Sequence, residues 1–205
     1  VMALVGNKGM DGFISLREAI IATNMDLGAD TISLSAGIYE LTLTGTNEDA
    51  AASGDLDILD ELTITGAGST LSIVDGLGLD KVFETRGGPT VTIEDLTVQG
   101  GNAANKWGGG INMENGGTVV LNRLLIRSNN GASGGGIYNY QGNLTVIDTT
   151  LAENTGSYGA GIYNDGGIAV LNRVTISENH ASNDGGGVYA FGAGANTTLT
   201  NVTIS

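Results

Sequence analysis

The strongest constraint on the fold is a Gly-rich phrase that returns at nearly constant spacing through the second half of the chain. It begins at residues 108, 134, 159 and 185, so the intervals are 26, 25 and 26 residues. The four copies read Gly108-Gly109-Gly110-Ile111, Gly134-Gly135-Gly136-Ile137, Gly159-Ala160-Gly161-Ile162 and Gly185-Gly186-Gly187-Val188. A fixed period of this length indicates a repeat architecture, in which each repeat adds one unit to a stack.

Each repeat also contains an eight-residue block of alternating apolar residues, and the spacing in this block indicates the structure of one repeat. The blocks end at Ile126, Leu151, Ile176 and Ile204, and apolar or small residues stand seven, five and two positions before each of them. Steps of two are typical of a strand with one face inside, and the single step of three indicates a corner. The spacing therefore predicts an all-β fold, a right-handed single-stranded parallel β-helix with three short strands per coil of about 25 residues.

The same spacing continues upstream with less regularity. Ile93, Leu96 and Val98 repeat it, but the distance from one block to the next grows to 28 and 34 residues. We expect these longer coils to carry surface loops, the clearest being the polar, Ala-rich segment 44–54. The whole chain, 1–205, is predicted to be one β-helix domain whose regular coils span 108–205.

The N-terminal region contains a helix-start signal. Ser15 and Glu18 have the spacing of a capping box, in which each side chain bonds the other residue's backbone N–H. We predict a short amphipathic helix over 15–24. It would cover the core and the unpaired strand edge at this end of the stack.

The phrase around this signal resembles a known family. Asp11-Gly12-Phe13-Ile14-Ser15-Leu16-Arg17-Glu18-Ala19-Ile20 is similar to the N-terminal motif of bacterial surface proteins named after Cys-Ser-Leu-Arg-Glu-Ala, with Ile14 in place of Cys. The Gly-Gly-Gly-Ile-Tyr-Asn phrases are similar to pectate-lyase-like β-helices of adhesins and polymorphic outer-membrane proteins. The resemblance implies an extracellular or cell-surface location and transfers no catalytic residues.

Composition excludes several classes. Net charge is −14, which disfavours binding to nucleic acid, and the absence of Cys excludes disulfides and thiolate chemistry. No apolar run is long enough for a membrane-spanning helix, and Val1–Val5 is too short for the apolar region of a signal peptide. We therefore expect neither a membrane span nor a signal peptide within this chain.

Three tyrosines are candidate binding residues. Tyr138, Tyr163 and Tyr189 each follow the inward aliphatic residue of the Gly-rich strand, so they are predicted to project outward in one row. Such a row could stack on sugar rings or on a partner surface. The alternative is that the rings only shield the strand edges and stiffen the sheet.

Two further columns are predicted at the corners. Arg123, Asp148 and Arg173 would alternate in charge, either as a strip for an acidic sugar or as stacked charges that relieve one another. Three asparagines lie three residues past the end of each block, where the chain must turn. Their side-chain amides are expected to form a structural ladder of Asn129, Asn154 and Asn179.

No cofactor is expected, although Asp55, Asp57 and Asp60 could bind Ca²⁺. The residues favour a non-enzymatic structural or adhesive β-helix. The chain would be part of a longer stalk or a subunit of a head-to-tail fibre that self-associates through the C-terminal end. The alternatives are a polysaccharide lyase or epimerase acting on acidic glycans, and a carbohydrate-binding module that uses the tyrosine row.

Overall fold

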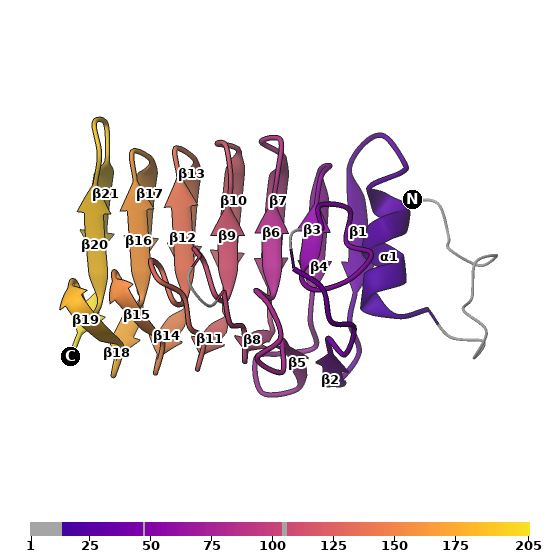
Figure 1. Ribbon diagram of the computed structural model, residues 1–205, viewed down its shortest axis with the longest axis horizontal. Helices are drawn as coiled ribbons and strands as arrows, with labels where there is room; N and C mark the ends of the chain where they lie inside the picture. Colours follow the sequence, from indigo (N-terminus) through magenta and orange to yellow (C-terminus); the bar gives the residue numbers. More distant parts are fainter. Residues whose placement is uncertain (1–13, 47, 104–105) are drawn as a thin grey trace.

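The computed structural model describes residues 14–46, 48–103 and 106–205, and over these ranges it is a stack of parallel strands with one short helix at the N-terminal end (Figure 1). Three parallel sheets run along the stack, so each full coil contributes one strand to each sheet. The predicted all-β parallel β-helix is confirmed. Residues 1–13, which hold the opening apolar residues and the start of the surface-protein motif, lie outside the described ranges.

The first sheet contains the strand that precedes each corner. Its strands, in spatial order, are β1 (Asp30–Ser33), β4 (Leu62–Thr65), β7 (Thr90–Glu94), β10 (Thr118–Asn122), β13 (Asn143–Ile147), β17 (Ile168–Asn172) and β21 (Asn196–Thr200). The second sheet contains the strand that follows the corner: β2 (Gly37–Glu40), β5 (Ser72–Asp75), β8 (Thr97–Gln99), β11 (Leu125–Arg127), β14 (Thr150–Ala152), β18 (Thr175–Ser177) and β22 (Thr203–Ile204).

The third sheet is built from the Gly-rich phrases and their upstream equivalents. It comprises β3 (Leu56–Ile58), β6 (Phe83–Thr85), β9 (Ile111–Met113), β12 (Ile137–Tyr140), β16 (Ile162–Asp165) and β20 (Val188–Phe191). A separate pair, β15 (Thr155–Tyr158) with β19 (His180–Asp184), widens the last coils. The outer face of the third sheet positions the candidate site.

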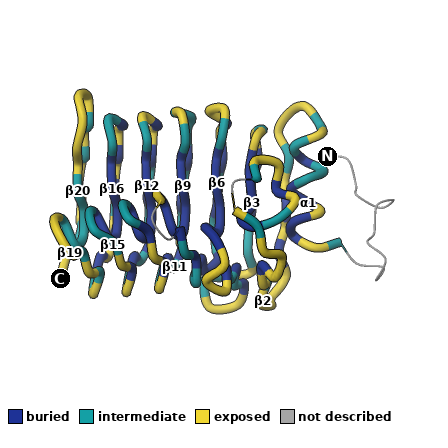
Figure 2. Tube along the Cα trace, viewed as in Figure 1, coloured by how far each residue is buried: buried dark blue, intermediate teal, exposed yellow. Residues whose placement is uncertain are grey.

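The core fills the interior of the coils (Figure 2). The four predicted inward positions of one coil, Val119, Leu121, Leu124 and Ile126, are all at most 3% exposed. The predicted columns are also in register, since Leu121 pairs with Val146, which in turn pairs with Leu171. Aliphatic side chains thus stack at the ~4.8 Å spacing of hydrogen-bonded strands.

Each corner depends on backbone in the left-handed region. After the first-sheet strand, Arg123, Asp148 and Arg173 have φ of 54°, 48° and 57°. Just before the third-sheet strand, the first Gly of each Gly-rich phrase also adopts the left-handed conformation. At Gly134, for example, φ is 65° and a Cβ would meet the Ile137 carbonyl. Glycine avoids that clash, which explains why the phrase repeats.

Helix α1 (Leu16–Thr23) lies across the first coil, as predicted (Figure 1). The Ser15–Glu18 capping box is formed, and Leu16 and Ile20 pack into the core. Among the described residues, no helix is long and apolar enough to cross a membrane.

The described residues of segment 44–54, namely 44–46 and 48–54, form a loop without strands, but the loop is not simply solvated. Ala51 is fully buried, and the buried Arg17 guanidinium donates hydrogen bonds to the carbonyls of Ala51, Gly54 and Asp55 at 2.7, 2.5 and 2.8 Å. The helix therefore fixes the loop against the start of the third sheet.

The last coil continues the same columns with more exposure. Leu199 and Ile204 extend the buried rows of the first and second sheets, yet they are 46% and 51% exposed. Stacking of this coil against further β structure, in this chain or another copy, remains a prediction.

Candidate ligand-binding site

One continuous column of side chains follows the outer face of the third sheet. Alternate residues of a strand point to opposite faces, so the residues next to the buried aliphatic ones project outward. From β3 to β20 the paired residues of this column are Asp57, Glu84, Asn112, Tyr138, Tyr163 and Tyr189. The face changes from carboxylates near the N-terminal cap to aromatic rings near the C-terminal end.

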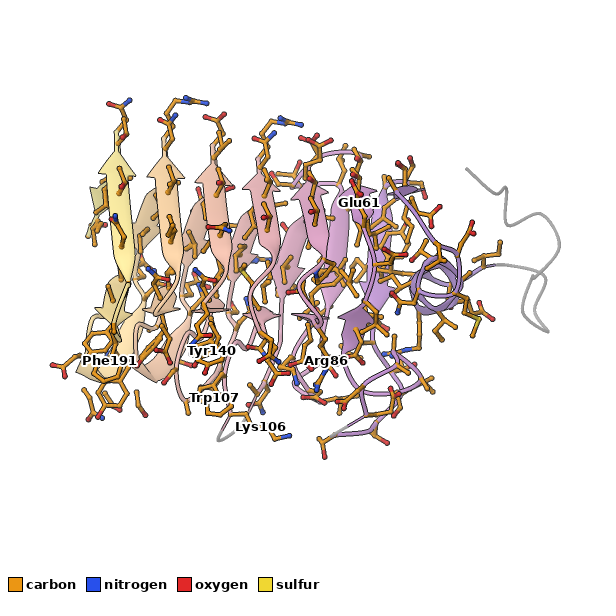
Figure 3. The ribbon with its side chains drawn as sticks, turned by 90° about the horizontal axis from the view of Figure 1, so that it is seen from above. Glu61, Arg86, Lys106, Trp107, Tyr140 and Phe191 are labelled. Atoms are coloured by element: carbon orange, nitrogen blue, oxygen red, sulfur yellow. The ribbon has the colours of Figure 1, made fainter. Side chains whose placement is uncertain are left out.

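The aromatic part is larger than the three predicted tyrosines. Neighbouring rings are in contact, with centroid distances of 5.6 Å for Trp107–Tyr138, 5.4 Å for Tyr138–Tyr163, 5.2 Å for Tyr163–Tyr189, 5.6 Å for Tyr158–Tyr189, 6.4 Å for Tyr138–Tyr140 and 6.3 Å for Tyr189–Phe191. We call these seven residues the aromatic row. Figure 3 shows Trp107, Tyr140 and Phe191 along one long side of the molecule, with Glu61 on the opposite side.

The predicted tyrosines do project away from the core, but two of them are covered by their neighbours. Tyr138 is only 5% exposed and Tyr163 only 9%, because rings stack on both sides of them. Trp107 and Phe191 are instead 48% and 57% exposed. The three tyrosines thus lie in one row on the outer face, but the accessible aromatic surface is offered mainly by their neighbours.

Two adjoining hollows form a groove on this face. The charged pocket, of about 330 Å³, is lined by Glu48, Asp49, Lys81, Glu84, Arg86, Lys106, Trp107, Asn112 and Glu114. The aromatic pocket, of about 370 Å³, is lined by Trp107, Glu114, Asn115, Tyr138, Tyr140 and Asp165. Trp107 and Glu114 line both pockets, so the two hollows meet at these side chains.

The charged pocket is crossed by an ion-pair network. Arg86 lies 2.8 Å from Asp49, 3.2 Å from Glu84 and 3.3 Å from Glu114. Burial by itself lowers the pKa of the Arg86 guanidinium, but attraction to Glu114, Glu84 and Asp49 outweighs it, so the pKa lies above its ordinary value. Arg86 therefore stays charged and organises three carboxylates at once.

Next to this network lie three buried carboxylates, one of which, Asp57, accepts a hydrogen bond from the backbone N–H of Ala51 at 2.9 Å. Asp55, Asp57 and Glu84 have oxygens within 4.8 Å of one another, and Lys81 Nζ lies 3.1 Å from Asp55 and 3.4 Å from Glu84. Burial, then repulsion by Asp55, raises the pKa of Asp57 to about 8. Burial likewise raises the pKa of Asp55 to about 6 in spite of Lys81. The Lys81 ammonium and the raised pKa of Asp57, which favours its neutral form, both reduce the negative charge that the cluster holds in a buried place.

This cluster differs from the predicted calcium set. Asp60 is not part of it, because its carboxylate accepts hydrogen bonds from the backbone N–H of Gly28 and Glu61. Glu84 takes its place, since β6 lies beside β3. The three buried carboxylates are residue types that hold a hard cation such as Ca²⁺, but the Lys81 ammonium already sits against two of them.

The Arg-Asp-Arg column pairs unevenly, and its charges relieve one another as the second interpretation has it. Asp148 forms a bidentate pair with Arg173, at 2.6 and 2.7 Å. Arg123 turns to the preceding coil, where it binds Asp95 at 2.7 and 2.6 Å and Glu94 at 2.9 Å. The charges therefore relieve one another in separate pairs on exposed corners, away from the aromatic row.

The asparagines form a ladder at their corner, in which Asn129 and Asn154 are buried. Asn129 Nδ2 donates to Asn154 Oδ1 at 3.1 Å, and Asn154 Nδ2 donates to Asn179 Oδ1 at 2.9 Å. The same side chains also bond backbone carbonyls, as Asn154 does with Ile126 at 3.0 Å. The ladder satisfies backbone groups that the turn leaves without strand partners.

The fold and the groove define a class: a parallel β-solenoid that displays aromatic and charged side chains on the outside of one sheet. The chain belongs to the family described as the right handed beta helix region, which matches residues 62–204. Comparison with curated proteins and with solved structures gave no match.

Proposed function

We propose that this chain is a non-enzymatic, extracellular β-helix that binds glycans along the aromatic row. The observation that carries the proposal is the run of contacting rings on one face, which leads into two pockets of about 330 and 370 Å³. The half-exposed rings of Trp107 and Phe191 in this row favour a binding role, because large apolar side chains are costly to leave in water without one.

The chemistry of the groove fits carbohydrate. The apolar faces of sugar rings stack on aromatic side chains, and their hydroxyls need donors and acceptors close by. In the aromatic pocket, Trp107 and Tyr140 supply rings, while Glu114, Asn115 and Asp165 supply polar atoms. The groove also runs across several coils, which suits an extended polymer better than a compact ligand.

A glycan array tests the proposal directly. Wild-type protein is compared with Trp107→Ala, Tyr140→Ala and a control, Ile168→Ala, which removes a half-exposed aliphatic side chain from the first sheet. We expect the two aromatic variants to lose most of the signal for the bound glycans and the control to keep it. Equal signals for all proteins, or no bound glycan, would contradict the proposal.

A surface location and an adhesive role complete the proposal. The resemblance of the N-terminal phrase to bacterial surface proteins and the acidic composition support it. Association through the exposed edge of the last coil is part of the same proposal. Electron microscopy of the purified chain checks it, with head-to-tail rows as the expected result and isolated particles at all concentrations as the opposing one.

A polysaccharide lyase or epimerase is the second candidate, favoured by one observation: the charged pocket combines carboxylates with Lys81, Arg86 and Lys106. A lyase needs a base and a cation that neutralises the uronate. It ranks second because Lys81 and Arg86 are engaged by the protein's own carboxylates. If the wild-type protein releases unsaturated products from a uronate polymer and Arg86→Ala does not, the lyase becomes the favoured function.

A further inference from the structure

The charged groups that line the aromatic pocket all have the same sign. Its lining contains two carboxylates, Glu114 and Asp165, and no basic side chain among the described residues. This differs from the charged pocket next to it, whose lining combines three basic and four acidic residues. A ligand that enters the aromatic pocket therefore meets aromatic rings and negative charge.

Glu114 keeps a surplus of negative charge despite its ion pair. Its partner Arg86 is shared with Asp49 and Glu84, and the Glu114 contact, at 3.3 Å, is the longest of the three. Lys81 also lies against Glu84 and Asp55, so two basic side chains together face four carboxylates. The neighbourhood of Glu114 remains attractive to a further cation.

Asp165 is held in place without being neutralised. It accepts a hydrogen bond from the Tyr138 hydroxyl at 2.9 Å. Burial, and then this hydrogen bond, raises the pKa of Tyr138, so the phenol stays protonated and acts only as a neutral donor. The bond orients the carboxylate at the edge of the pocket and leaves its charge available to a ligand.

Aromatic faces beside carboxylates are a binding environment for amines and quaternary ammonium groups. The ring quadrupole attracts a cation and the carboxylates add a charge-assisted hydrogen bond. We infer that the aromatic pocket selects a positively charged group, so that the preferred ligand is an amine-bearing glycan rather than a neutral or acidic one. This inference rests on the proposed glycan binding and specifies its ligand class.

Isothermal titration with glucosamine oligomers and fully N-acetylated oligomers of the same length, at mildly acidic pH, tests the inference. We expect the amine form to bind about tenfold tighter, which corresponds to about 1.4 kcal/mol and is the size expected for a partly desolvated cation on aromatic rings. Glu114→Gln and Asp165→Asn should each remove most of this preference. Asp165→Asn keeps an acceptor for the Tyr138 hydroxyl, so its effect reports charge rather than lost packing.

The control is Glu153→Gln, which removes one carboxylate at a corner outside both pockets and should leave the preference unchanged. Equal affinity for the two oligomers would overturn the inference and leave glycan binding intact. When no oligomer binds, choline tests for the cation site alone, because it is a quaternary ammonium ion without a sugar ring. If no oligomer binds but choline binds wild type and not Asp165→Asn, the cation site stands and glycan binding falls. If choline also fails to bind, both are overturned.

Discussion

The indole ring of Trp107 lies 5.6 Å from the Tyr138 ring, centroid to centroid, with 16° between the two planes. Trp107 comes from the segment between β8 and β9, whereas Tyr138 belongs to β12, one coil further on. The stacking covers Tyr138 and leaves Trp107 half exposed where the charged and aromatic pockets meet. The loops as well as the strands thus shape this face.

The asparagine ladder should be a major contributor to stability. Asn154→Ala removes the acceptor for Asn129 and the donor to Asn179 and Ile126, in a fully buried position. We expect the free energy of unfolding to fall by about 2 kcal/mol, since buried partners lose their hydrogen bonds. Urea denaturation measures the loss, with exposed Asn143→Ala as the control. A similar midpoint for both variants would argue against the ladder's role.

Buried and exposed ion pairs should respond differently to the same kind of change. Lys81→Met leaves Asp55 and Glu84 buried without their ammonium partner, and we expect a loss of about 3 to 5 kcal/mol. Arg173→Met breaks the exposed pair with Asp148 and should leave thermal unfolding nearly unchanged. Comparable losses from both variants would contradict the burial argument.

Calcium provides a second test of the same cluster. Because the Lys81 ammonium lies against Asp55 and Glu84, we expect Ca²⁺ to leave the Tm of the wild type unchanged. In Lys81→Met the vacated space is open to a cation, and Ca²⁺ should recover part of the lost Tm. A Ca²⁺-dependent rise in the wild-type Tm, removed by a chelator, would show that lysine is not the neutralising cation.

The raised pKa of Asp57 predicts how stability depends on pH. The folded protein holds this proton up to a pKa of about 8, whereas the unfolded chain releases it near 3.8. The folded state therefore binds more protons between these values, and stability falls as pH rises through the window. Asp57→Asn should flatten this fall when urea midpoints are compared across it. An unchanged slope would mean that Asp57 is ionised in the folded state.

The start of the Gly-rich phrase should not tolerate a side chain. Gly134→Ala places a Cβ at φ 65°, against the Ile137 backbone, and we expect a loss of about 1 to 3 kcal/mol from the left-handed conformation alone. Gly37→Ala, where nothing lies within 4 Å of the added Cβ, is the matched control and should be neutral or slightly stabilising. Chemical denaturation of the two variants gives the comparison.

The sequence predicted the coil because its constraints repeat. A strand period of two, interrupted by one step of three, allows only one assignment of inward residues, and Leu121 and Ile126 lie where that assignment puts them. The capping box could be predicted because its two residues, Ser15 and Glu18, belong to the same helical turn. Both features depend on short-range geometry.

The site was only partly predictable, because its contacts cross irregular coils. Extending the outward column upstream from Tyr138 would have reached Glu84 and Asp57, but the variable coil lengths hid that register. Stepping two residues beyond each tyrosine would have found Tyr140 and Phe191. Trp107 and Tyr158 also had a signal, since each stands directly before the Gly-rich phrase of its coil, and parallel bridges link both to Ser133 between them. The pairing of Arg123 with Asp95 was missed because that carboxylate lies in a longer coil.

The central claim, that the outer face of the third sheet binds glycans, is best tested by the fluorescence of Trp107. It is the single tryptophan of the chain and it lies between the two pockets, so its emission reports the groove alone. Titration with an amine-bearing oligosaccharide should give a saturable change in emission, with the same Kd that calorimetry measures and a weaker response in Tyr140→Ala. Calorimetric binding without any change in Trp107 emission would place the ligand elsewhere and contradict the account.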